Sequence, residues 1–361
     1  MNKKVSIGII GCGGIANGKH LPSLSTVEDV ELVAFCDLIP ERAEAAKEKY
    51  GAPDAKVFTD YKELLKLSDI DVVHVLTPNR EHADITIDAL HAGKDVMCEK
   101  PMAKTAADAY RMCEAAKETG RKLTIGYQHR HKPEAVCAKQ AIESGELGEI
   151  YYAKCYAIRR RATPNWGVFL NEEEQGGGPV IDIATHSLDL TLYLMDNWEP
   201  QMVVGKTHKM LENPEEANSW GPDGVKETSL EESACAFVLM KNGATILVET
   251  SWALNTTDVI EEGSCVLCGS KGGLSIINNK LSFNTVKYGR TFDTGVCTRF
   301  GGVAFYAGKT CTPQQTEAER WIDAVKNGKK PVVLPEQALV VSQILEAIYT
   351  SSKTGKPVYF G

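Results

Sequence analysis

Three side chains in the sequence are of types that move a proton near neutral pH, and they occur in two short clusters. Lys100 stands in the triplet Glu99-Lys100-Pro101, directly after an apolar run. Asp182 and His186 stand four residues apart, a spacing that places both on one face of a helix. An imidazole has an ordinary pKa of about 6.5 and suits the removal of a proton from an alcohol. An amine can hold the oxygen of a substrate and relay its proton. The clusters therefore predict acid–base chemistry on a hydroxyl group.

Each cluster also has a purely structural interpretation, which stays open on these residues alone. Lys100 can be an ordinary surface lysine. Asp182 can cap the start of a helix, with His186 as a half-buried core histidine. Asp189, three residues further on, is expected to be solvated or to serve packing. A dinucleotide-binding pattern elsewhere in the chain favours the catalytic interpretation of both clusters.

That pattern is Gly11-x-Gly13-x-x-Ala16, which follows the apolar run 4–10. In a strand–turn–helix unit the first glycine permits a tight turn, and the second lets the backbone approach a pyrophosphate. The small third residue lets the helix pack against the strand. The start of the helix presents free N–H groups and a partial positive charge to the phosphates. The expected cofactor contacts here are Gly11, Gly13, Gly14, Ile15 and Ala16.

A second apolar run, 31–36, ends at Asp37, 21 residues after Ala16. A carboxylate at this point accepts hydrogen bonds from both ribose hydroxyls and repels a 2′-phosphate. The next residues, Leu38-Ile39-Pro40, offer no arginine for such a phosphate, although Arg42 follows on the next helix. The predicted cofactor is therefore NAD, with Asp37 and Leu38 among its contacts.

Short apolar strands alternate with helical segments in the first part of the chain. Strands are expected at 4–10, 31–36, 57–58, 71–76, 95–98 and 122–125, and helices at 41–50, 61–67, 82–92 and 106–119. This alternation predicts an α/β Rossmann domain, a parallel doubly wound sheet, over residues 1–126. Ligands of such sheets bind where the strands end. Further cofactor contacts are therefore expected at Thr77, Pro78, Asn79, His82, Glu99, Lys100 and Gln128.

After residue 126, strand-like runs come without crossover helices. They are 150–158, 202–207, 234–239, 244–252, 263–268 and 273–277, and two helices, 313–327 and 335–351, close the chain. Turn signals such as Lys241-Asn242-Gly243 are typical of antiparallel hairpins. Residues 127–361 are thus predicted to form an α+β domain with a large, mostly antiparallel sheet. This domain is expected to bind the substrate and to oligomerise, and its C-terminal helix is a candidate for packing back on the first domain.

Composition excludes several classes of protein. The chain has 361 residues, 43% hydrophobic and 24% charged, and a net charge of −8 without a long basic run. This argues against a nucleic-acid partner, and no apolar run approaches the ~20 residues that span a bilayer. The first residues suggest a strand rather than a signal peptide, so we expect a cytoplasmic protein.

The chain has 11 cysteines, of which one pair, Cys265 and Cys268, has CxxC spacing. No second pair and no histidine pair stands at the distance of a zinc site. The pair lies in a Val/Leu-rich stretch and is expected to belong to a buried strand with reduced thiols. A redox or metal role is the alternative, and no metal is predicted.

The order of these motifs resembles the glucose–fructose oxidoreductase/inositol dehydrogenase (Gfo/Idh/MocA) family over essentially the whole chain. The motifs that carry the resemblance are Gly11-x-Gly13-x-x-Ala16, Thr77-Pro78-Asn79-x-x-His82, Glu99-Lys100-Pro101, Arg130-x-x-Pro133 and Gly176-Gly177-Gly178-Pro179-Val180-Ile181-Asp182-x-x-x-His186. Members of this family generally oxidise or reduce a secondary alcohol on a sugar, inositol or related polyol with NAD or NADP.

The resemblance implies a catalytic set of Lys100, Asp182 and His186. It places Lys100 beside the nicotinamide and implies a cis Lys100–Pro101 bond, with Glu99 steadying either Lys100 or the nicotinamide ribose. His186 is the implied general base, while Asp182 either positions the substrate hydroxyl or tunes Lys100 and His186. The glycine run 176–178 is implied to bring the chain close to the cofactor.

Gln128 stands where relatives of this family often have asparagine. Its amide can bond either the carboxamide or the ribose of the cofactor, so the contact is left open between the two.

An aromatic and basic stretch precedes the Asp182–His186 segment. Sugar pockets commonly pair a flat aromatic surface with polar donors. The predicted substrate contacts are Lys100, Arg130, Tyr156, Arg159, Trp166, Asp182 and His186. Surface ion pairs or a subunit interface are the alternative for the arginines. Arg159-Arg160-Arg161, followed by Pro164-x-Trp166-Gly167, resembles the branch that acts on pyranoses and glycosides, including enzymes that oxidise C3.

The leading functional hypothesis is an NAD-dependent dehydrogenase that oxidises a secondary ring hydroxyl, possibly at C3, of a pyranose, glycoside or cyclitol. The alternatives are an inositol dehydrogenase and an NAD-retaining glycosidase that works by oxidation and elimination. A non-catalytic NAD-sensing regulator is disfavoured because the chain keeps both Lys100 and His186. A homo-oligomer is expected, because the open face of a large sheet has to be covered. The resemblance implies a homodimer or homotetramer formed through that face.

Overall fold

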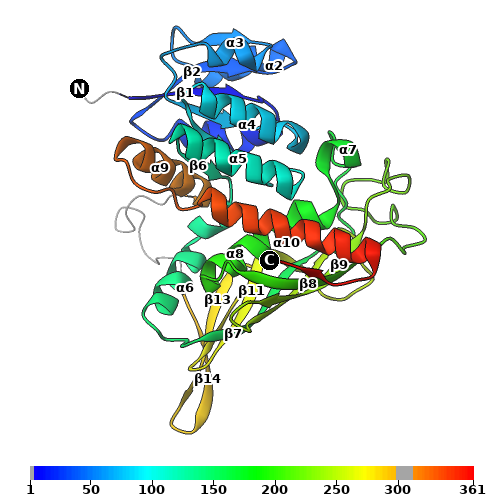
Figure 1. Cartoon of the computed structure of the whole chain (residues 1–361). Helices are drawn as coiled ribbons and strands as arrows, with labels where there is room; N and C mark the ends of the chain where they lie inside the picture. The colour runs from blue at the N-terminus through cyan, green and yellow to red at the C-terminus, as the bar shows by residue number, and fades with distance from the viewer. Residues whose placement is uncertain (1–3, 298–311) are drawn as a thin grey trace. The chain divides into compact units, whose positions relative to one another are not determined.

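The computed structural model describes residues 4–297 and 312–361, which fall into two compact units (Figure 1). Unit 1 comprises residues 1–128 and 311–339, and unit 2 comprises residues 129–310 and 340–361. The chain thus contributes to unit 1 a second time near its end, with α9 (Pro313–Lys326) and the first turn of α10 (Pro335–Thr354).

Unit 1 is built on a six-stranded parallel sheet with the order β3-β2-β1-β4-β5-β6. Its strands are β1 (Val5–Ile10), β2 (Val30–Cys36), β3 (Lys56–Phe58), β4 (Val72–Val75), β5 (Asp95–Cys98) and β6 (Leu123–Ile125). The strand order reverses direction between β1 and β4. In sheets of this kind the crevice at that point binds the ligand. The predicted Rossmann fold is confirmed.

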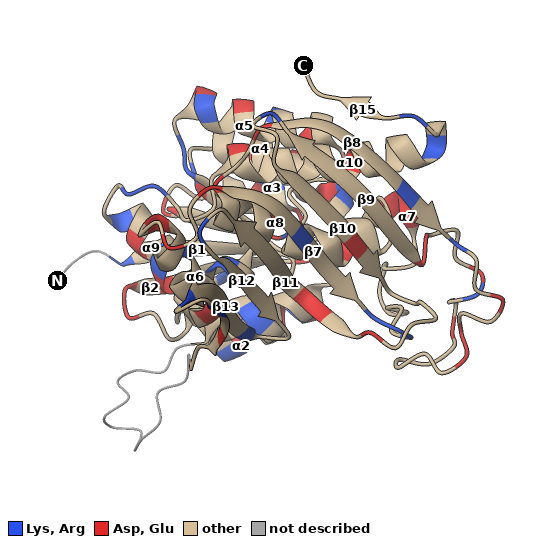
Figure 2. Ribbon diagram, turned by 90° about the horizontal axis from the view of Figure 1, so that it is seen from below, with Lys and Arg blue, Asp and Glu red and all other residues tan. Residues whose placement is uncertain are grey.

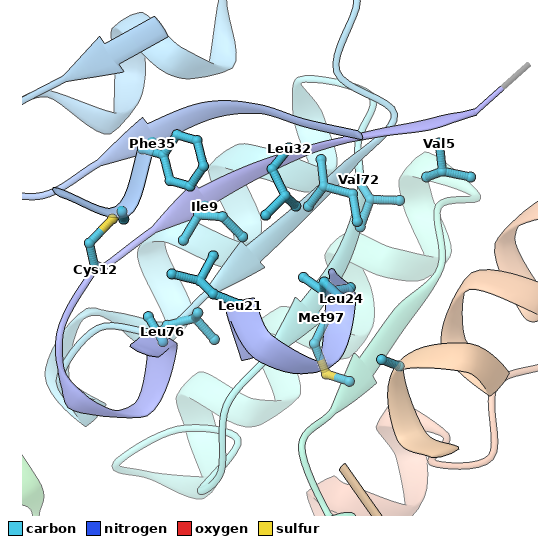
Figure 3. Packing of buried hydrophobic residues seen from close by; sticks show 14 of the residues in the cluster. Val5, Ile9, Cys12, Leu21, Leu24, Leu32, Phe35, Val72, Leu76 and Met97 are labelled. Carbon is cyan, nitrogen blue, oxygen red and sulfur yellow. The ribbon is translucent and has the colours of Figure 1, made fainter. Parts of the chain in front are cut away.

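Helices connect these strands and bury the apolar faces of the sheet. They are η1 (Ala16–His20), α1 (Leu21–Leu24), α2 (Pro40–Tyr50), α3 (Tyr61–Leu65), η2 (Asn79–Glu81), α4 (His82–His91) and α5 (Ala106–Thr119). Ile9, Leu21, Phe35 and Val72 pack together in the core (Figure 3), and Trp321 of α9 joins the same cluster. Each such side chain stabilises the fold by about 1.5–3 kcal/mol through burial.

Unit 2 contains a nine-stranded sheet with the order β14-β13-β12-β11-β7-β10-β9-β8-β15. Its strands are β7 (Ile150–Ile158), β8 (Pro200–His208), β9 (Ser233–Met240), β10 (Thr245–Ser251), β11 (Ile260–Gly269), β12 (Gly273–Ile277), β13 (Lys280–Lys287), β14 (Arg290–Gly295) and β15 (Val358–Tyr359). Neighbouring strands are antiparallel, except that β7 and β10 run parallel. The predicted large, mostly antiparallel sheet is confirmed.

The two faces of this sheet differ in what covers them within the chain. One face buries small and apolar side chains such as Cys155 and Leu267 beneath α8 (Thr185–Met195). The opposite face carries half-buried Tyr156, Phe237 and Leu247. Phe237 pairs with Leu247 across β9 and β10, and each of the three alternates along its strand with buried residues. Figure 2 shows that strands β7 to β10 carry few charged residues.

Unit 2 also contains most of η3 (Gln128–His131), together with α6 (Pro133–Glu143), α7 (Glu172–Gln175), η4 (Val180–Ala184) and the later part of α10. The sequence analysis did not predict α6, β13 or β14. The buried residues of α6 are two alanines, Ala135 and Ala138, so its apolar stripe is narrow. Strand β14 is exposed along its whole length and shows no alternating burial.

The CxxC pair lies in a strand, as predicted. Cys265 pairs with Cys155 on the buried face of the sheet, whereas Cys268 pairs with Tyr152 on the other face. Their side chains therefore point to opposite sides of β11. In the described ranges, no helix is both long and apolar enough to cross a membrane.

Candidate active site

The glycine turn after β1 has the geometry that its sequence predicts. Gly11 has a φ of 92°, and a Cβ atom there would lie 2.6 Å from the carbonyl oxygen of Leu76. Cβ atoms on Gly13 and Gly14 would meet no heavy atom within 4 Å, so open space adjoins both residues. Asn17 donates from Nδ2 to the carbonyl oxygens of Cys12 and Gly13 at 2.8 and 3.0 Å and fixes the turn. The first N–H groups of a helix have no intrahelical partners, so a helix start beside this open space suits an anionic group.

Asp37 is tied to the same turn. Its Oδ2 accepts a hydrogen bond from the N–H of Cys12 at 2.8 Å, and its Oδ1 accepts one from the N–H of Ile39 at 2.9 Å. Each carboxylate oxygen has a second lone pair. Leu38 beside it is 88% exposed, and Ile15 is 42% exposed. A fixed carboxylate between exposed apolar side chains suits a ribose that carries a flat base.

Glu99 lies at the end of β5 and is held from several sides. Its Oε1 accepts from Lys19 Nζ at 2.6 Å and from His20 Nε2 at 2.7 Å, and its Oε2 accepts from the N–H of Lys100 at 3.0 Å. Burial opposes the ionisation of Glu99, but Lys19 and His20 outweigh it and hold its pKa well below the usual range. Glu99 therefore steadies the backbone of Lys100, one of the two roles that the sequence analysis left open.

Lys100 itself is half-buried and is followed by a cis peptide bond to Pro101, as the resemblance implied. Its neighbour His82 is buried, with Nδ1 2.8 Å from the carbonyl oxygen of Pro101 and Nε2 2.9 Å from that of Thr77. Burial lowers the pKa of His82. His82, a predicted cofactor contact, thus braces two loops at this sheet edge. Asn79 is buried beside them and Pro78 is exposed.

Four residues buried around Glu99 were not predicted from the sequence: Lys19, His20, His74 and Glu317. Lys19 Nζ contacts Gln128 Oε1 at 2.9 Å and Glu317 Oε2 at 3.0 Å, besides Glu99. A signal was available, because Lys19 and His20 follow Ala16 by three and four residues and so share its buried helix face. Nothing in the local sequence of α9 pointed to Glu317.

In unit 2, Asp182 lies in η4 and His186 in the first turn of α8, one helical turn apart as predicted. Asp182 is half-buried, and its Oδ2 accepts a hydrogen bond from Trp252 Nε1 at 3.0 Å. His186 is 6% exposed, and the centroid of its ring lies 4.8 Å from that of His129. Trp252 fixes the carboxylate, and the packing of two rings limits the rotation of His186.

The glycine run before Asp182 is clamped inside unit 2. Glu231 accepts from the N–H of Gly178 with both oxygens at 3.0 Å, and Tyr349 donates to Glu231 Oε1 at 2.7 Å. A Cβ on Gly177 would collide with the Tyr349 hydroxyl, and one on Gly178 would lie 2.6 Å from the carbonyl oxygen of Glu231. The resemblance implied that these glycines approach the cofactor. In the structure they make room for Tyr349 and Glu231.

Arg130, predicted to bind substrate, is fully buried. It donates from Nε and Nη2 to the two oxygens of Asp189 at 2.9 and 2.6 Å. Its guanidinium lies over the rings of Tyr193 and Trp198. This placement corrects the prediction, because a buried, doubly bonded and stacked guanidinium holds the core of unit 2 together. Asp189 likewise is not solvated but is the buried partner of Arg130.

Tyr156, also predicted to bind substrate, is on the other face of the sheet from α8. It pairs with Glu249 in the register of β7 and β10, while its neighbours Cys155 and Ala157 face the buried side. Within one chain it therefore does not reach the face that carries His186, and the prediction is not supported.

Arg159 and Trp166, both expected to contact the substrate, are linked through Trp220, a residue that was not predicted from the sequence. Arg159 bonds Glu262 at 3.1 Å and lies over the ring of Trp220, which meets Trp166 edge to face at 4.7 Å. Trp166 in turn meets Phe169 at 5.5 Å between ring centroids. Phe169 packs against the buried cluster that contains Trp252, the partner of Asp182. The exposed indoles are thus linked by contacts to the Asp182 segment.

Two family descriptions match the chain. Residues 5–127 match an oxidoreductase family with an NAD-binding Rossmann fold, and residues 139–360 match the C-terminal alpha/beta domain of an oxidoreductase family.

Similar proteins extend over the whole chain. D-glucoside 3-dehydrogenase of Escherichia coli (strain K12) is 33% identical over 359 residues, which cover 98% of this chain and 96% of that protein. The scyllo-inositol 2-dehydrogenase (NAD(+)) of Bacillus subtilis (strain 168) is 26% identical over 362 residues, 99% of this chain and 97% of that protein. The crystal structure of aldose-aldose oxidoreductase from Caulobacter crescentus has a TM-score of 0.79 at 26% identity and covers 99% of this chain and 100% of that one.

Proposed function

Because the chain belongs to the Gfo/Idh/MocA oxidoreductase family, we propose that it is an NAD-dependent dehydrogenase that oxidises the C3 hydroxyl of a D-glucoside. The observation that carries the proposal is the 33% identity to a D-glucoside 3-dehydrogenase over 98% of the chain. Lys100, Asp182 and His186, the residue types that such a reaction needs, are all present.

The residues at the end of the parallel sheet fit NAD. The turn from Gly11 to Ala16 offers helix N–H groups and open space for the pyrophosphate. Asp37 accepts the ribose hydroxyls and repels a 2′-phosphate. The nicotinamide, when bound, supplies the acceptor for the hydride that leaves the carbon of the alcohol. The protein has to bind and orient the sugar and move one proton.

We assign the removal of the proton from the substrate hydroxyl to His186. Its Nδ1 has almost no exposed surface, so Nε2 is the nitrogen that takes the proton of the substrate hydroxyl. The ammonium of Lys100 holds the same substrate oxygen and stabilises the negative charge that grows on it. Asp182, fixed by Trp252, orients the hydroxyl.

The aromatic group of Trp166 and Trp220, with Arg159, is proposed to hold the sugar ring. The C–H face of a pyranose packs on an indole, and the guanidinium donates hydrogen bonds to ring hydroxyls. Both indoles are exposed, 48% and 43%, although large apolar side chains of this kind are usually buried.

A panel of substrates tests the proposal. With methyl D-glucoside as the substrate, the enzyme is expected to reduce NAD faster than NADP. The 3-deoxy analogue lacks the proposed reacting hydroxyl and is expected not to react. Faster reduction with scyllo- or myo-inositol than with any glucoside would overturn the substrate class. Cleavage of an aryl glucoside without net formation of NADH would overturn the dehydrogenase reaction.

The open face of the nine-stranded sheet is proposed to be covered by a second copy of the chain. Tyr156, Phe237 and Leu247 lie half-buried there and form an apolar surface. Introducing a charge with Phe237→Glu is expected to shift the protein to monomers in light scattering. An unchanged mass would contradict this interface.

We also propose that the enzyme works in the cytoplasm. In residues 4–297 and 312–361 the cysteines are free thiols, which a reducing compartment maintains.

A further inference from the structure

Five ionisable side chains form a buried cluster in unit 1: Lys19, His20, His74, Glu99 and Glu317. Each of them is at most 6% exposed. They come from η1, β4, the end of β5 and α9, which are far apart in the sequence. Burying charged groups is costly unless they are paired and hydrogen-bonded.

Lys19 satisfies that condition with all of its donors. An ammonium group has three N–H bonds, and Nζ has three acceptors: Glu99 Oε1 at 2.6 Å, Gln128 Oε1 at 2.9 Å and Glu317 Oε2 at 3.0 Å. Burial opposes the charge, but Glu317 and Glu99 outweigh it and raise the pKa of Lys19. Lys19 is therefore charged.

These contacts fix two neighbouring groups. Lys19 and His20 occupy Oε1 of Glu99, and Oε2 accepts from the backbone of Lys100. Because an ammonium can only donate, it also selects the amide orientation of Gln128 in which the oxygen faces Lys19. The NH₂ group of Gln128 then points away from the cluster.

The two histidines continue this arrangement. A carboxylate only accepts, so His20 carries its proton on Nε2 toward Glu99. Burial lowers the pKa of His20 and His74 and keeps both neutral. His20 Nδ1 therefore accepts from His74 Nδ1, at 3.1 Å. The chain of donors runs in one direction, from His74 through His20 to Glu99, and supports the ionised carboxylate.

We propose that Lys19 is a positioning residue of the cofactor site, which holds the Glu99 carboxylate and the Gln128 amide in the orientations that bind the nicotinamide end of NAD. This rests on the proposed function, which places that end of the cofactor beside Lys100. Glu317 supports Lys19 from α9, so the second segment of unit 1 also contributes to the site.

Titration of protein fluorescence with NADH tests the inference. Lys19→Met is expected to weaken NADH binding about tenfold or more, as for the loss of a charged hydrogen-bond partner. Glu317→Gln, which keeps the shape and removes one charge, is expected to weaken it less. Lys94→Met is the matched control. Lys94 is 5% exposed in unit 1 and donates to the carbonyl oxygens of Leu67 and Ile70, away from the cluster.

The pH dependence separates positioning from general support of the fold. Glu99 contacts Lys19, His20 and the backbone N–H of Lys100. Its charge also acts on His74 and His82, and Glu317 shares Lys19 with it. Without Lys19, burial dominates and the pKa of Glu99 moves upward. NADH binding by Lys19→Met is then expected to weaken as the pH falls from ~8 to ~5, while binding by the wild type stays level across that range. Lys19→Arg restores the charge and is expected to restore pH independence with intermediate affinity.

Several outcomes overturn the inference. Wild-type affinity and a level pH profile in Lys19→Met would do so, and so would an equal loss in Lys94→Met. If Lys19→Met does not fold, Lys19→Arg tests the inference in its place. NADH affinity equal to that of the wild type in Lys19→Arg would overturn it, because a guanidinium does not reproduce the geometry of the three acceptors around an ammonium. Failure of the wild type itself to bind NADH would overturn the proposed function as well, which the other outcomes leave intact.

Discussion

The two units hold their candidate functional residues by different physical means. In unit 1, Glu99 is fixed by a buried ion pair with Lys19 and a hydrogen bond from His20, and it holds the backbone N–H of Lys100 in turn. In unit 2, the segment before Asp182 is fixed by close packing, because two glycines leave room for Tyr349 and Glu231. A charged network depends on protonation, whereas a packed turn depends on the volume of a side chain. The units should therefore respond to different perturbations.

The largest effect is expected at the two residues proposed to handle the proton and the substrate oxygen, one from each unit. His186→Ala and Lys100→Met are each expected to lower kcat/KM by about 10²- to 10⁴-fold, the usual contribution of an acid–base group. NADH binding by His186→Ala should stay unchanged in a fluorescence titration, because His186 is proposed to act on the substrate hydroxyl and not to bind the cofactor. His208→Ala, which alters an exposed histidine of β8, is the control. Turnover near that of the wild type in both variants would refute the assignment.

The next effect sharpens the contribution of unit 1. Asp37→Ser removes the carboxylate from the glycine turn and is expected to weaken NAD binding about 10- to 100-fold. It should also raise the preference for NADP, because the repulsion of a 2′-phosphate is lost. Steady-state KM values for both cofactors measure this. An unchanged ratio of the two would show that Asp37 does not select the cofactor.

The packed turn of unit 2 is tested by volume. Gly177→Ala places a methyl group against the Tyr349 hydroxyl and is expected to lower the free energy of unfolding by about 1–3 kcal/mol through overpacking. Tyr349→Phe in the same chain removes the colliding oxygen and should recover part of that loss. Urea unfolding of the single and double variants measures the coupling. Equal stability of Gly177→Ala and the wild type would mean that the turn tolerates the added volume.

The smallest effect distinguishes the units by pH. Glu99 has a lowered pKa, so its contribution to the stability of unit 1 is present above its ordinary pKa of 4.5 and is lost as the pH falls. Burial raises the pKa of Glu231, so its contribution has the opposite sign: it is present below 4.5 and is lost as the pH rises through the folded pKa. Hydrogen-exchange protection should thus fall in β5 relative to η4 on acidification. Parallel changes in both would contradict this difference.

The parallel sheet could be predicted well because its strands are continuous apolar runs that end at glycines and polar clusters. The expected bounds of β5 and α5 and the fold class agree with the structure. The predicted family and the NAD cofactor agree with the matching family description. Elements with little buried surface, such as α6 and β14, leave no periodic pattern to detect.

The candidate site could be predicted only where its residues carry a local motif. Lys19 and Glu317 come from distant segments, and their pairing is a product of the tertiary fold. Arg130 and Tyr156 show the converse error. Both residue types are common in sugar sites. In the structure, however, Arg130 is bound to the buried carboxylate of Asp189, and the alternation of side chains along β7 places Tyr156 on the face away from α8.

Isotope labelling tests most directly whether the hydride that reduces NAD comes from C3 of a D-glucoside, as we propose. With a methyl D-glucoside that carries deuterium at C3, the account predicts that the deuterium appears in the NADH formed, with a 3-keto glycoside as the product. NADH without deuterium, together with a product that keeps the label at C3, would contradict it.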